Sequence, residues 1–281
     1  NYYLYSYIKL MIIPNHISFL KKISTTLQTS DNHNIEVWEL VIDDESDLCS
    51  WAKHFRECYC LDDEIDILRE GTGLSRAGYL EKLVFPDRSI APGPSIRSGD
   101  FAELLIADYL EYLMQYWVPR GKFAEKESRN ESAKGVDILG IKVNDINKES
   151  IDDVLLTFEV KAQLTGKTYN NRLQTAIDDS SKDYFRQATT LNATKRRLVH
   201  SQQFDKVILI QRFQNPVDRP YKYLSGAAAV LSDSAYDELA ITKQTATSKH
   251  QNVSNLQLIV IRGTNLMQFV HALYERAAHE A

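Results

Sequence analysis

Residues 154–165 read VLLTFEVKAQLT, a stretch in which apolar and polar side chains alternate. Because successive side chains of a β-strand point to opposite faces of the sheet, this alternation predicts a strand with two unlike faces. One face carries an apolar stripe made of Leu156, Phe158, Val160, Ala162 and Leu164. The other face carries Thr157, Glu159, Lys161 and Gln163. Such a polar row is typical either of the solvated face of an edge strand or of a binding site on a sheet.

A second strand is predicted just before this one. Residues 135–143, GVDILGIKV, read as a strand buried on both faces, with Asp137 as its one carboxylate. The polar loop at residues 144–153 allows the two strands to pair antiparallel, which brings Asp137 towards Glu159. A buried carboxylate needs partners, and two neighbouring carboxylates repel each other unless a cation lies between them. Mg²⁺ suits such a site because it prefers oxygen ligands.

A helix is predicted over residues 100–117, where apolar and aromatic residues recur at three- and four-residue spacing. Glu103 near its start has two interpretations. It can form a capping box with Asp100, because Asp-x-x-Glu is a pattern of helix starts. It can also be a third carboxylate of the cation site, and the two roles are not wholly exclusive.

Strands and helices interleave over the rest of the chain, which predicts an α/β fold with a mixed sheet flanked by helices. The further strands are expected at residues 121–126, 205–212 and 256–262, and the further helices at 170–198, broken near Ser180, and 264–278. A loop rich in proline, glycine and serine, residues 85–98, divides the chain. Before it we expect an N-terminal α+β extension, residues 1–97, as a candidate for partner binding. For residues 98–281 we expect the main domain, with a C-terminal strand–helix tail.

The chain has 281 residues, with 33 Lys and Arg against 38 Asp and Glu, so its net charge is −5. This charge excludes a globally basic nucleic-acid coat protein but allows a local basic groove. No apolar stretch approaches the ~20 residues of a membrane-spanning helix, and residues 1–20 lack a signal-peptide cleavage site. Three cysteines fit a reducing compartment, and the spacing of Cys49, His54, Cys58 and Cys60 is unlike that of structural zinc sites. We therefore expect a cytoplasmic protein with buried thiols.

Asp137, the triplet Glu159-Val160-Lys161 and Glu103 on the preceding helix together resemble the motif set of the PD-(D/E)xK nuclease superfamily. The expected order of helix, three strands, helix and strand is similar to the restriction-endonuclease-like core of that superfamily, over about residues 100–212. Val136 stands where a proline is common, and the 22-residue step from Asp137 to Glu159 is somewhat long. Asp152 and Asp153 are alternative acids, although they precede the strand.

The resemblance implies a nuclease that depends on Mg²⁺, for which Mn²⁺ can substitute. Asp137, Glu159 and the backbone carbonyl of Val160 would bind the metal, and Glu103 would orient a metal-bound water or hold a second ion. Lys161 would orient or help to deprotonate the attacking water and offset charge on the phosphate. Gln163 would orient Lys161 or contact the phosphate.

A narrower similarity is to the HamA/AbpA-type nuclease subunit of Hachiman antiphage defence. The stretches that carry it are RSGDFAELLIADYLE at 97–111, KGVDILG at 134–140 and FEVKAQLTG at 158–166. This similarity implies a bacterial defence effector that acts on DNA beside a helicase-like partner, which restrains or delivers the nuclease.

Contacts to nucleic acid have to come from local cations. Lys126, Arg129 and Lys134 lie just before Asp137 and are the candidates, although acidic neighbours dilute their charge. The alternative to an enzyme is a non-catalytic module of the same fold that binds nucleic acid or protein, with Glu159 and Lys161 as a surface ion pair. The P-loop and the Gly-x-Ser-x-Gly motif of other α/β enzymes are absent from the sequence.

Overall fold

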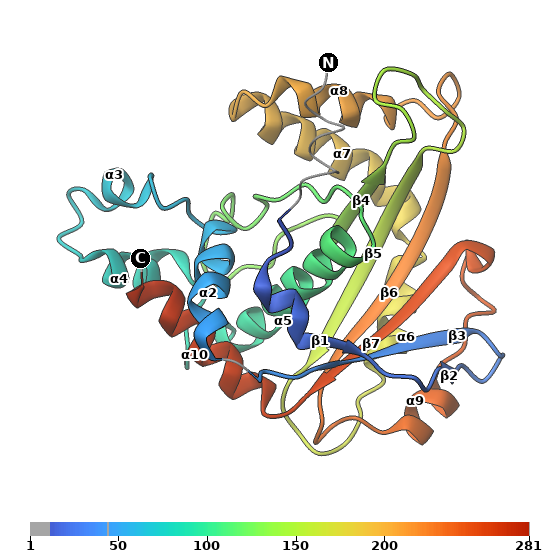
Figure 1. Cartoon of the computed structure of the whole chain (residues 1–281), viewed down its shortest axis with the longest axis horizontal. Coiled ribbons are helices and arrows are strands. Elements are labelled where there is room, and N and C mark those ends of the chain that lie inside the picture. Colours follow the sequence, from blue (N-terminus) through green and yellow to red (C-terminus); the bar gives the residue numbers. More distant parts are fainter. Residues whose placement is uncertain (1–11, 44, 281) are drawn as a thin grey trace.

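The computed structural model describes residues 12–43 and 45–280 of the chain. Residues 1–11, which belong to the stretch considered for a signal peptide, lie outside this part. In the described part, a seven-stranded sheet lies between two layers of helices (Figure 1). The predicted fold class, an α/β fold with a mixed sheet flanked by helices, is confirmed.

The strand order in this sheet is β1–β3–β7–β6–β5–β4, and β2 pairs with β3 outside the row. The strands β3, β7, β6 and β5 run parallel, whereas β1 and β4 pair antiparallel at the two ends of the row. The bounds are Leu20–Lys22 for β1, Leu27–Gln28 for β2, Asn34–Leu40 for β3, Ile138–Lys142 for β4, Val154–Gln163 for β5, Lys222–Ser232 for β6 and Leu256–Gly263 for β7.

Helices cover both faces of the sheet, with α5 in front and α6 behind in Figure 1. On the α5 side lie α2 (Leu48–Glu57), α5 (Gly93–Asp108) and α10 (Leu266–His279). On the α6 side lie α6 (Arg172–Ser180), α7 (Asp183–His200) and α8 (Phe204–Arg212). Shorter helices are α3 (Ile65–Arg69), α4 (Arg76–Tyr79) and α9 (Glu238–Gln244). None of the described helices has the length and apolar character needed to cross a membrane.

Single helical turns complete the described part. Turns of 3-10 type are Asn15–Phe19, Glu45–Asp47 and Val253–Asn255. Turns of π type follow two of the α-helices: Leu80–Val84 follows α4, and Tyr109–Leu113 continues α5.

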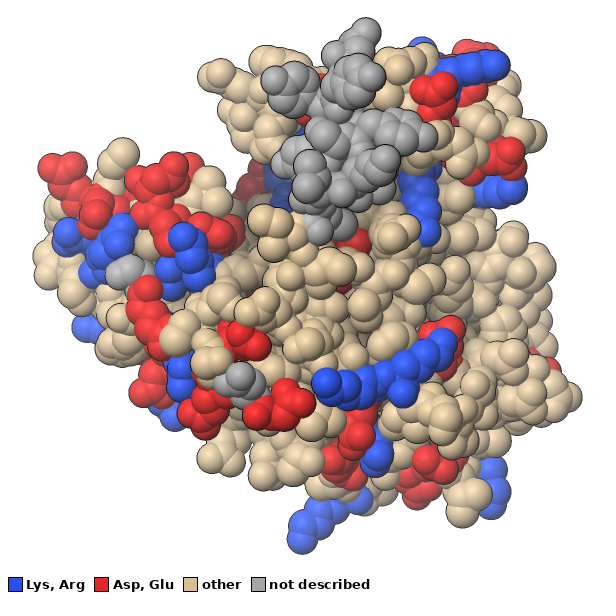
Figure 2. All heavy atoms as spheres, in the orientation of Figure 1, with Lys and Arg blue, Asp and Glu red and all other residues tan. Residues whose placement is uncertain are grey.

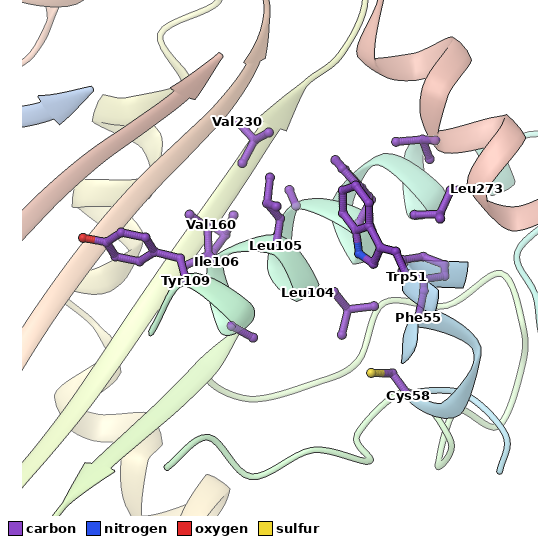
Figure 3. Packing of buried hydrophobic residues seen from close by; sticks show 14 of the residues in the cluster. Trp51, Phe55, Cys58, Leu104, Leu105, Ile106, Tyr109, Val160, Val230 and Leu273 are labelled. Carbon is purple, nitrogen blue, oxygen red and sulfur yellow. The ribbon is translucent and has the colours of Figure 1, made fainter. Parts of the chain in front are cut away.

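The apolar stripe of β5 faces α5, as the alternation predicts. Phe158 and Val160 belong to a buried cluster that also contains Trp51 and Leu105, and Figure 3 shows Val160 and Val230 pointing towards α5. The polar face of β5 therefore points to the opposite layer, where α6 and α7 lie. Because β5 is an interior strand between β4 and β6, the interpretation of its polar row as the solvated face of an edge strand is wrong.

The first 97 residues are not set apart from this sheet. Strand β3 pairs with β7 along its length, with Val37 opposite Val260, and β3 is the partner of β1 as well. Helix α2 packs against α10. The rings of Phe55 and Tyr274 meet edge to face there, with 4.8 Å between their centroids. The boundary expected between residues 97 and 98 falls inside α5.

Two predictions about individual elements are wrong, and one strand was not predicted. Residues 205–212 form the helix α8, because the apolar run at 207–210 fits a buried strand or a helix equally well. In this helix Val207 and Ile210 are buried and Ile208 is 64% exposed. Residues 121–126 form turns instead of a strand. The long strand β6 is missed because its glycine and alanines at 226–229 have low strand propensity.

Gly226 of β6 lies opposite Phe158 of β5, and the phenyl ring covers it. A Cβ atom at this position would be 2.1 Å from two ring carbons. We expect Gly226→Ala to lower the free energy of unfolding by roughly 1–3 kcal/mol, because the ring or the strand must shift. Urea denaturation measures this loss. Gly99→Ala, where a Cβ would meet no atom within 4 Å, is the matched control, and equal stability of the two variants would contradict the packing.

Candidate active site

Asp137 and Glu159 come together where the β4–β5 ladder ends. The pairing is antiparallel with Ile138 opposite Phe158, so the next position places Asp137 beside Glu159. The Oδ2 atom of Asp137 accepts a hydrogen bond of 2.8 Å from the backbone N–H of Val160. Because the N–H and C=O of one strand residue point to the same edge, the carbonyl of Val160 also faces the side of Asp137. The predicted antiparallel hairpin is confirmed.

Glu159 is buried, and its charge is only partly compensated. Its side chain is 5% exposed, and its Oε1 accepts a hydrogen bond of 2.6 Å from Nζ of Lys161. Its Oε2 lies 3.7 Å from Nη1 of Arg186 but has no hydrogen-bond donor among the described residues. Burial, and then the negative charge of Asp137, raise the pKa of Glu159 to about 7. The Oε2 atom of this buried carboxylate therefore accepts no hydrogen bond from the described residues, although Arg186 lies near it.

Lys161 is held between two carboxylates. Its Nζ atom is 2.6 Å from Oε1 of Glu159 and 3.0 Å from Oδ2 of Asp179 on α6. Burial lowers the pKa of Lys161, but the hydrogen bonds and charges of Glu159 and Asp179 outweigh it, so that the pKa is raised overall. Lys161 is therefore an ammonium ion at neutral pH. An ammonium can bind a phosphate oxygen or orient a water molecule, but it cannot accept a proton from water. The first two roles are therefore favoured for Lys161.

Glu103 reaches the site from the interior of α5. The helix begins at Gly93, so Asp100 and Glu103 are not at a helix start and do not form the capping box. The carboxylate of Glu103 forms an ion pair with Lys122, whose ammonium also donates to the backbone carbonyl of Asp137. Burial raises the pKa of Glu103 to about 8, and the charge of Asp137 adds to this rise despite the ion pair. Lys122 thus links α5 to the turn before β4 and competes with any second cation at Glu103.

Sequence reasoning missed the charged residues that α7 brings to the site. Asp183 is fully buried at the start of α7, and neither of its carboxylate oxygens has a hydrogen-bond partner among the described residues. Nη1 of Arg186 lies 3.5 Å from Oδ1 of Asp183 and 3.7 Å from Oε2 of Glu159. Burial, and then the charge of Glu159, raise the pKa of Asp183 to about 8. The signal in the sequence was the charged run DDSSKDYFR at 178–186, at the predicted break of the long helix.

Gln163 lies on the polar face of β5, but its amide holds a loop instead of Lys161. It donates a hydrogen bond of 2.7 Å to the carbonyl of Thr168 and accepts one of 2.9 Å from the N–H of Asn170. These bonds fix the segment between β5 and α6. The structure therefore does not bring the Gln163 amide together with the charged groups of the site.

Two of the three cations predicted to bind nucleic acid are engaged inside the protein. The side chain of Lys126 is 4% exposed and pairs with Asp100, and Arg129 binds Asp87 and the carbonyl of Glu81. Only Lys134 of the three is exposed. On the face seen in Figure 2, Lys and Arg are interspersed with Asp and Glu, and acidic side chains gather over α3.

The family model of HamA matches residues 15–277, which is most of the chain. The chain belongs to the HamA family. The narrower similarity predicted from residues 97–111, 134–140 and 158–166 is confirmed by this match. Membership of the family indicates a component of the multi-protein Hachiman antiphage defence system. A search of curated proteins found no match.

A different group of side chains in this HamA-family chain has the close spacing of metal ligands. His16, His54 and Asp108 bring three ligand atoms within 4.8 Å of one another, the one such group found in residues 12–43 and 45–280. Asp108 is within 3.0 Å of both imidazoles and accepts a hydrogen bond of 2.7 Å from Arg120. Because Arg120 already supplies the positive charge, we interpret this group as a buried hydrogen-bond network. The thiols of Cys58 and Cys60 are free and buried, as predicted, whereas the free thiol of Cys49 is exposed, so the prediction is wrong for Cys49.

Asp137, Glu159 and Val160 carry oxygen donors of the kind that a divalent cation binds. They offer two carboxylates and a backbone carbonyl at neighbouring positions, and Oε2 of Glu159 is a buried oxygen without a donor. Oxygen ligands of this kind are those that Mg²⁺ and Mn²⁺ prefer. Glu103 contributes to the site chiefly through Lys122, which already neutralises it.

Metal binding is expected to stabilise this chain more at about pH 8.5 than at about pH 6. The pKa values of Glu159 and Asp183 are raised to about 7 and about 8, so the folded chain retains protons that the unfolded chain has lost. The stability that these two groups contribute is complete below about pH 4 and is lost as the pH rises through about 7 to 8. A cation bound at these carboxylates would replace those protons, so its effect is expected to grow over the same range.

Thermal denaturation with and without Mn²⁺ at the two pH values measures the effect. Glu159→Gln is expected to abolish the dependence of the metal effect on pH. A melting temperature that Mn²⁺ raises equally at both pH values in the wild type would contradict the expectation.

Proposed function

We propose that this HamA-family chain is a metal-dependent nuclease of the PD-(D/E)xK type, which hydrolyses phosphodiester bonds of nucleic acid, with DNA as the substrate we favour. The observation that carries the proposal is the meeting of Asp137, Glu159 and Lys161 at the end of the β4–β5 ladder. The raised pKa values of Glu103, Glu159 and Asp183 support the proposal, because carboxylates with strongly shifted pKa values cluster at functional sites.

Hydrolysis of a phosphodiester needs an activated water and positive charge beside the phosphate and the leaving oxygen. In the proposed site Asp137, Glu159 and the carbonyl of Val160 hold Mg²⁺, for which Mn²⁺ substitutes. An ion held there would lower the pKa of a bound water and would offset negative charge on the phosphate. The separation of Glu103 from these ligands by Lys122 favours one ion over two.

The chain's own cations supply the remaining functions in this mechanism. Lys161 is fixed by Glu159 and Asp179, so its ammonium is positioned to hold the attacking water and a phosphate oxygen with little loss of freedom. Arg186 is 35% exposed and adds positive charge along the same edge. Lys122 fixes the turn that carries Asp137 through the backbone carbonyl of that residue.

A non-catalytic module is the alternative, and burial argues against it. In that interpretation Glu159 and Lys161 are a surface ion pair, but their side chains are 5% and 24% exposed. Surface pairs contribute little and need no enclosed site, whereas Glu159 is enclosed with further buried acids around it. The enclosed carboxylates are better explained by a cation that they bind.

We further propose that a helicase-like partner delivers nucleic acid to this chain. The net charge is −5, and Lys126 and Arg129 are engaged in internal contacts, so the chain alone offers few cations to phosphates. Affinity for nucleic acid rises with the number of phosphates that cations neutralise. Membership of the HamA family, which indicates a multi-protein defence system, supports a partner of this kind, and we propose the cytoplasm as the place of action.

The test is incubation of plasmid DNA with the chain and Mg²⁺ or Mn²⁺, with and without the helicase-like protein. We expect cleavage that needs the divalent ion and is abolished by EDTA. Binding of nucleic acid without cleavage under all of these conditions would favour the non-catalytic module. Electrophoresis of the products separates the two outcomes.

A further inference from the structure

A second cavity lies beside the proposed cleavage site, at the junction of α6 and α7. It has a volume of about 260 Å³, and its lining includes Tyr184, Tyr223, Ser225, His250, Gln251 and Asn252. We call it the Tyr184 pocket. None of the residues that line it is Lys, Arg, Asp or Glu. The pocket is smaller than the roughly 300–1,000 Å³ of sites for drug-sized ligands, so it suits a single planar ring system.

Strand β5 connects this pocket to the cleavage site. The hydroxyls of Tyr223 and Thr157 are 2.6 Å apart, and Ser225 lies opposite Thr157 in the β5–β6 ladder. Thr157 precedes Glu159 by two residues on the same face, which is about 7 Å along a strand. The buried Asp183, which approaches Glu159 through Arg186, directly precedes Tyr184 in the chain. The pocket is therefore within one nucleotide's reach of Glu159.

The chemistry of the lining matches a nucleobase and not a phosphate. Tyr184 is 57% exposed, and its ring meets that of Tyr223 edge to face with 5.8 Å between the centroids. An aromatic surface is therefore open at the pocket. His250 is uncharged, because its Nδ1 accepts the backbone N–H of Asn252 at 3.0 Å and burial lowers its pKa. An uncharged lining with aromatic and hydrogen-bonding groups offers stacking and edge contacts to a base but no charge to an anion.

We propose that the Tyr184 pocket binds an unpaired base of the strand that is cut at Glu159, so that the substrate is single-stranded or locally opened nucleic acid. This inference rests on the proposed nuclease function. Lys161, Lys182 and Arg186, which form ion pairs with Asp179 or Glu159, lie on the Glu159 side of the junction, where the sugar-phosphate backbone of that strand would run. In a duplex the bases are stacked and paired, so none can enter the pocket without leaving the helix.

Binding of a single-stranded oligonucleotide that contains 2-aminopurine tests the proposal without cleavage. The experiment uses the full chain with Ca²⁺ in place of Mg²⁺ and compares Tyr184→Ala, Tyr184→Phe and wild type. Stacking in the pocket quenches the fluorescence of the base, so we expect Tyr184→Ala to lose the quenching and to bind at least about tenfold more weakly. Tyr184→Phe retains the ring and is expected to bind within about twofold of wild type. Phe204→Ala, which removes another exposed aromatic residue outside the pocket, is the matched control.

Cleavage of an abasic substrate separates this proposal from the nuclease function. We expect an abasic nucleotide next to the cut bond to slow the wild type by at least about tenfold and to leave the rate of Tyr184→Ala unchanged. Wild-type cleavage that treats single strands, duplexes and abasic strands alike would overturn the pocket and leave the nuclease function intact. A wild type that binds and cuts no nucleic acid would overturn both.

Discussion

Glu159→Gln is expected to lower the rate of Mg²⁺-dependent cleavage by at least about 10²-fold. The amide keeps the size of the side chain but removes the negative charge that binds the ion. It also removes a buried carboxylate whose pKa is raised to about 7, so the variant is expected to be as stable as the wild type, or more stable, at neutral pH. A fall in activity with no fall in stability separates a role in metal binding from a role in the fold.

The matched control for this variant is Asp178→Asn, which removes an exposed carboxylate on α6 next to Asp179. It is expected to cleave within about twofold of wild type, because a surface change away from the ion costs little. Initial rates of plasmid nicking and thermal denaturation curves measure both variants. Equal rates for Glu159→Gln and Asp178→Asn would place the chemistry elsewhere.

Asp108→Ala is expected to lower the free energy of unfolding by about 3 kcal/mol. Asp108 is buried and accepts hydrogen bonds from Arg120 at 2.7 Å and from the imidazole rings of His16 and His54. Its removal leaves these donors without an acceptor, although Arg120 keeps its ion pair with Glu111. Urea denaturation of the wild type and the variant measures the loss.

Asp108→Asn is the matched control, because its amide retains one oxygen that accepts hydrogen bonds. We expect it to lose about half as much stability. Because Arg120 supplies the positive charge of this network, we expect the network to hold no metal. EDTA is therefore expected to cause no fall in the melting temperature of the purified wild type through this network. A large drop with EDTA that Asp108→Ala removes would show that the group holds a metal.

The sequence predicts elements well where the side-chain pattern itself carries the information. The alternation in residues 154–165 correctly predicts β5, and the antiparallel pairing with β4 follows from the polar loop between them. The side-chain pattern does not predict β6. There alanines and Gly226 form a strand because β5 and β7 flank them and because the Phe158 ring needs the space. Residues 205–212 fail for the opposite reason, since a wholly apolar run has no period that separates a strand from a helix.

The site was predictable in part for a similar physical reason. Asp137, Glu159 and Lys161 stand out because charged groups on apolar or alternating strands need partners. Lys122 and Asp183 do not stand out in the sequence, because their roles depend on how a turn and helix α7 pack against the sheet. Gln163 was expected to orient Lys161 or to contact the phosphate, and Lys126 was expected to bind nucleic acid. Local partners in a loop and in α5 engage both side chains instead.

The measurement that tests the account most directly is a crystal structure with Mn²⁺, located by its anomalous scattering. We expect one strong peak about 2.1 Å from carboxylate oxygens of Asp137 and Glu159 and from the carbonyl oxygen of Val160. A peak at His16, His54 and Asp108 instead, or no peak near Glu159 at saturating Mn²⁺, would contradict the assignment of this site.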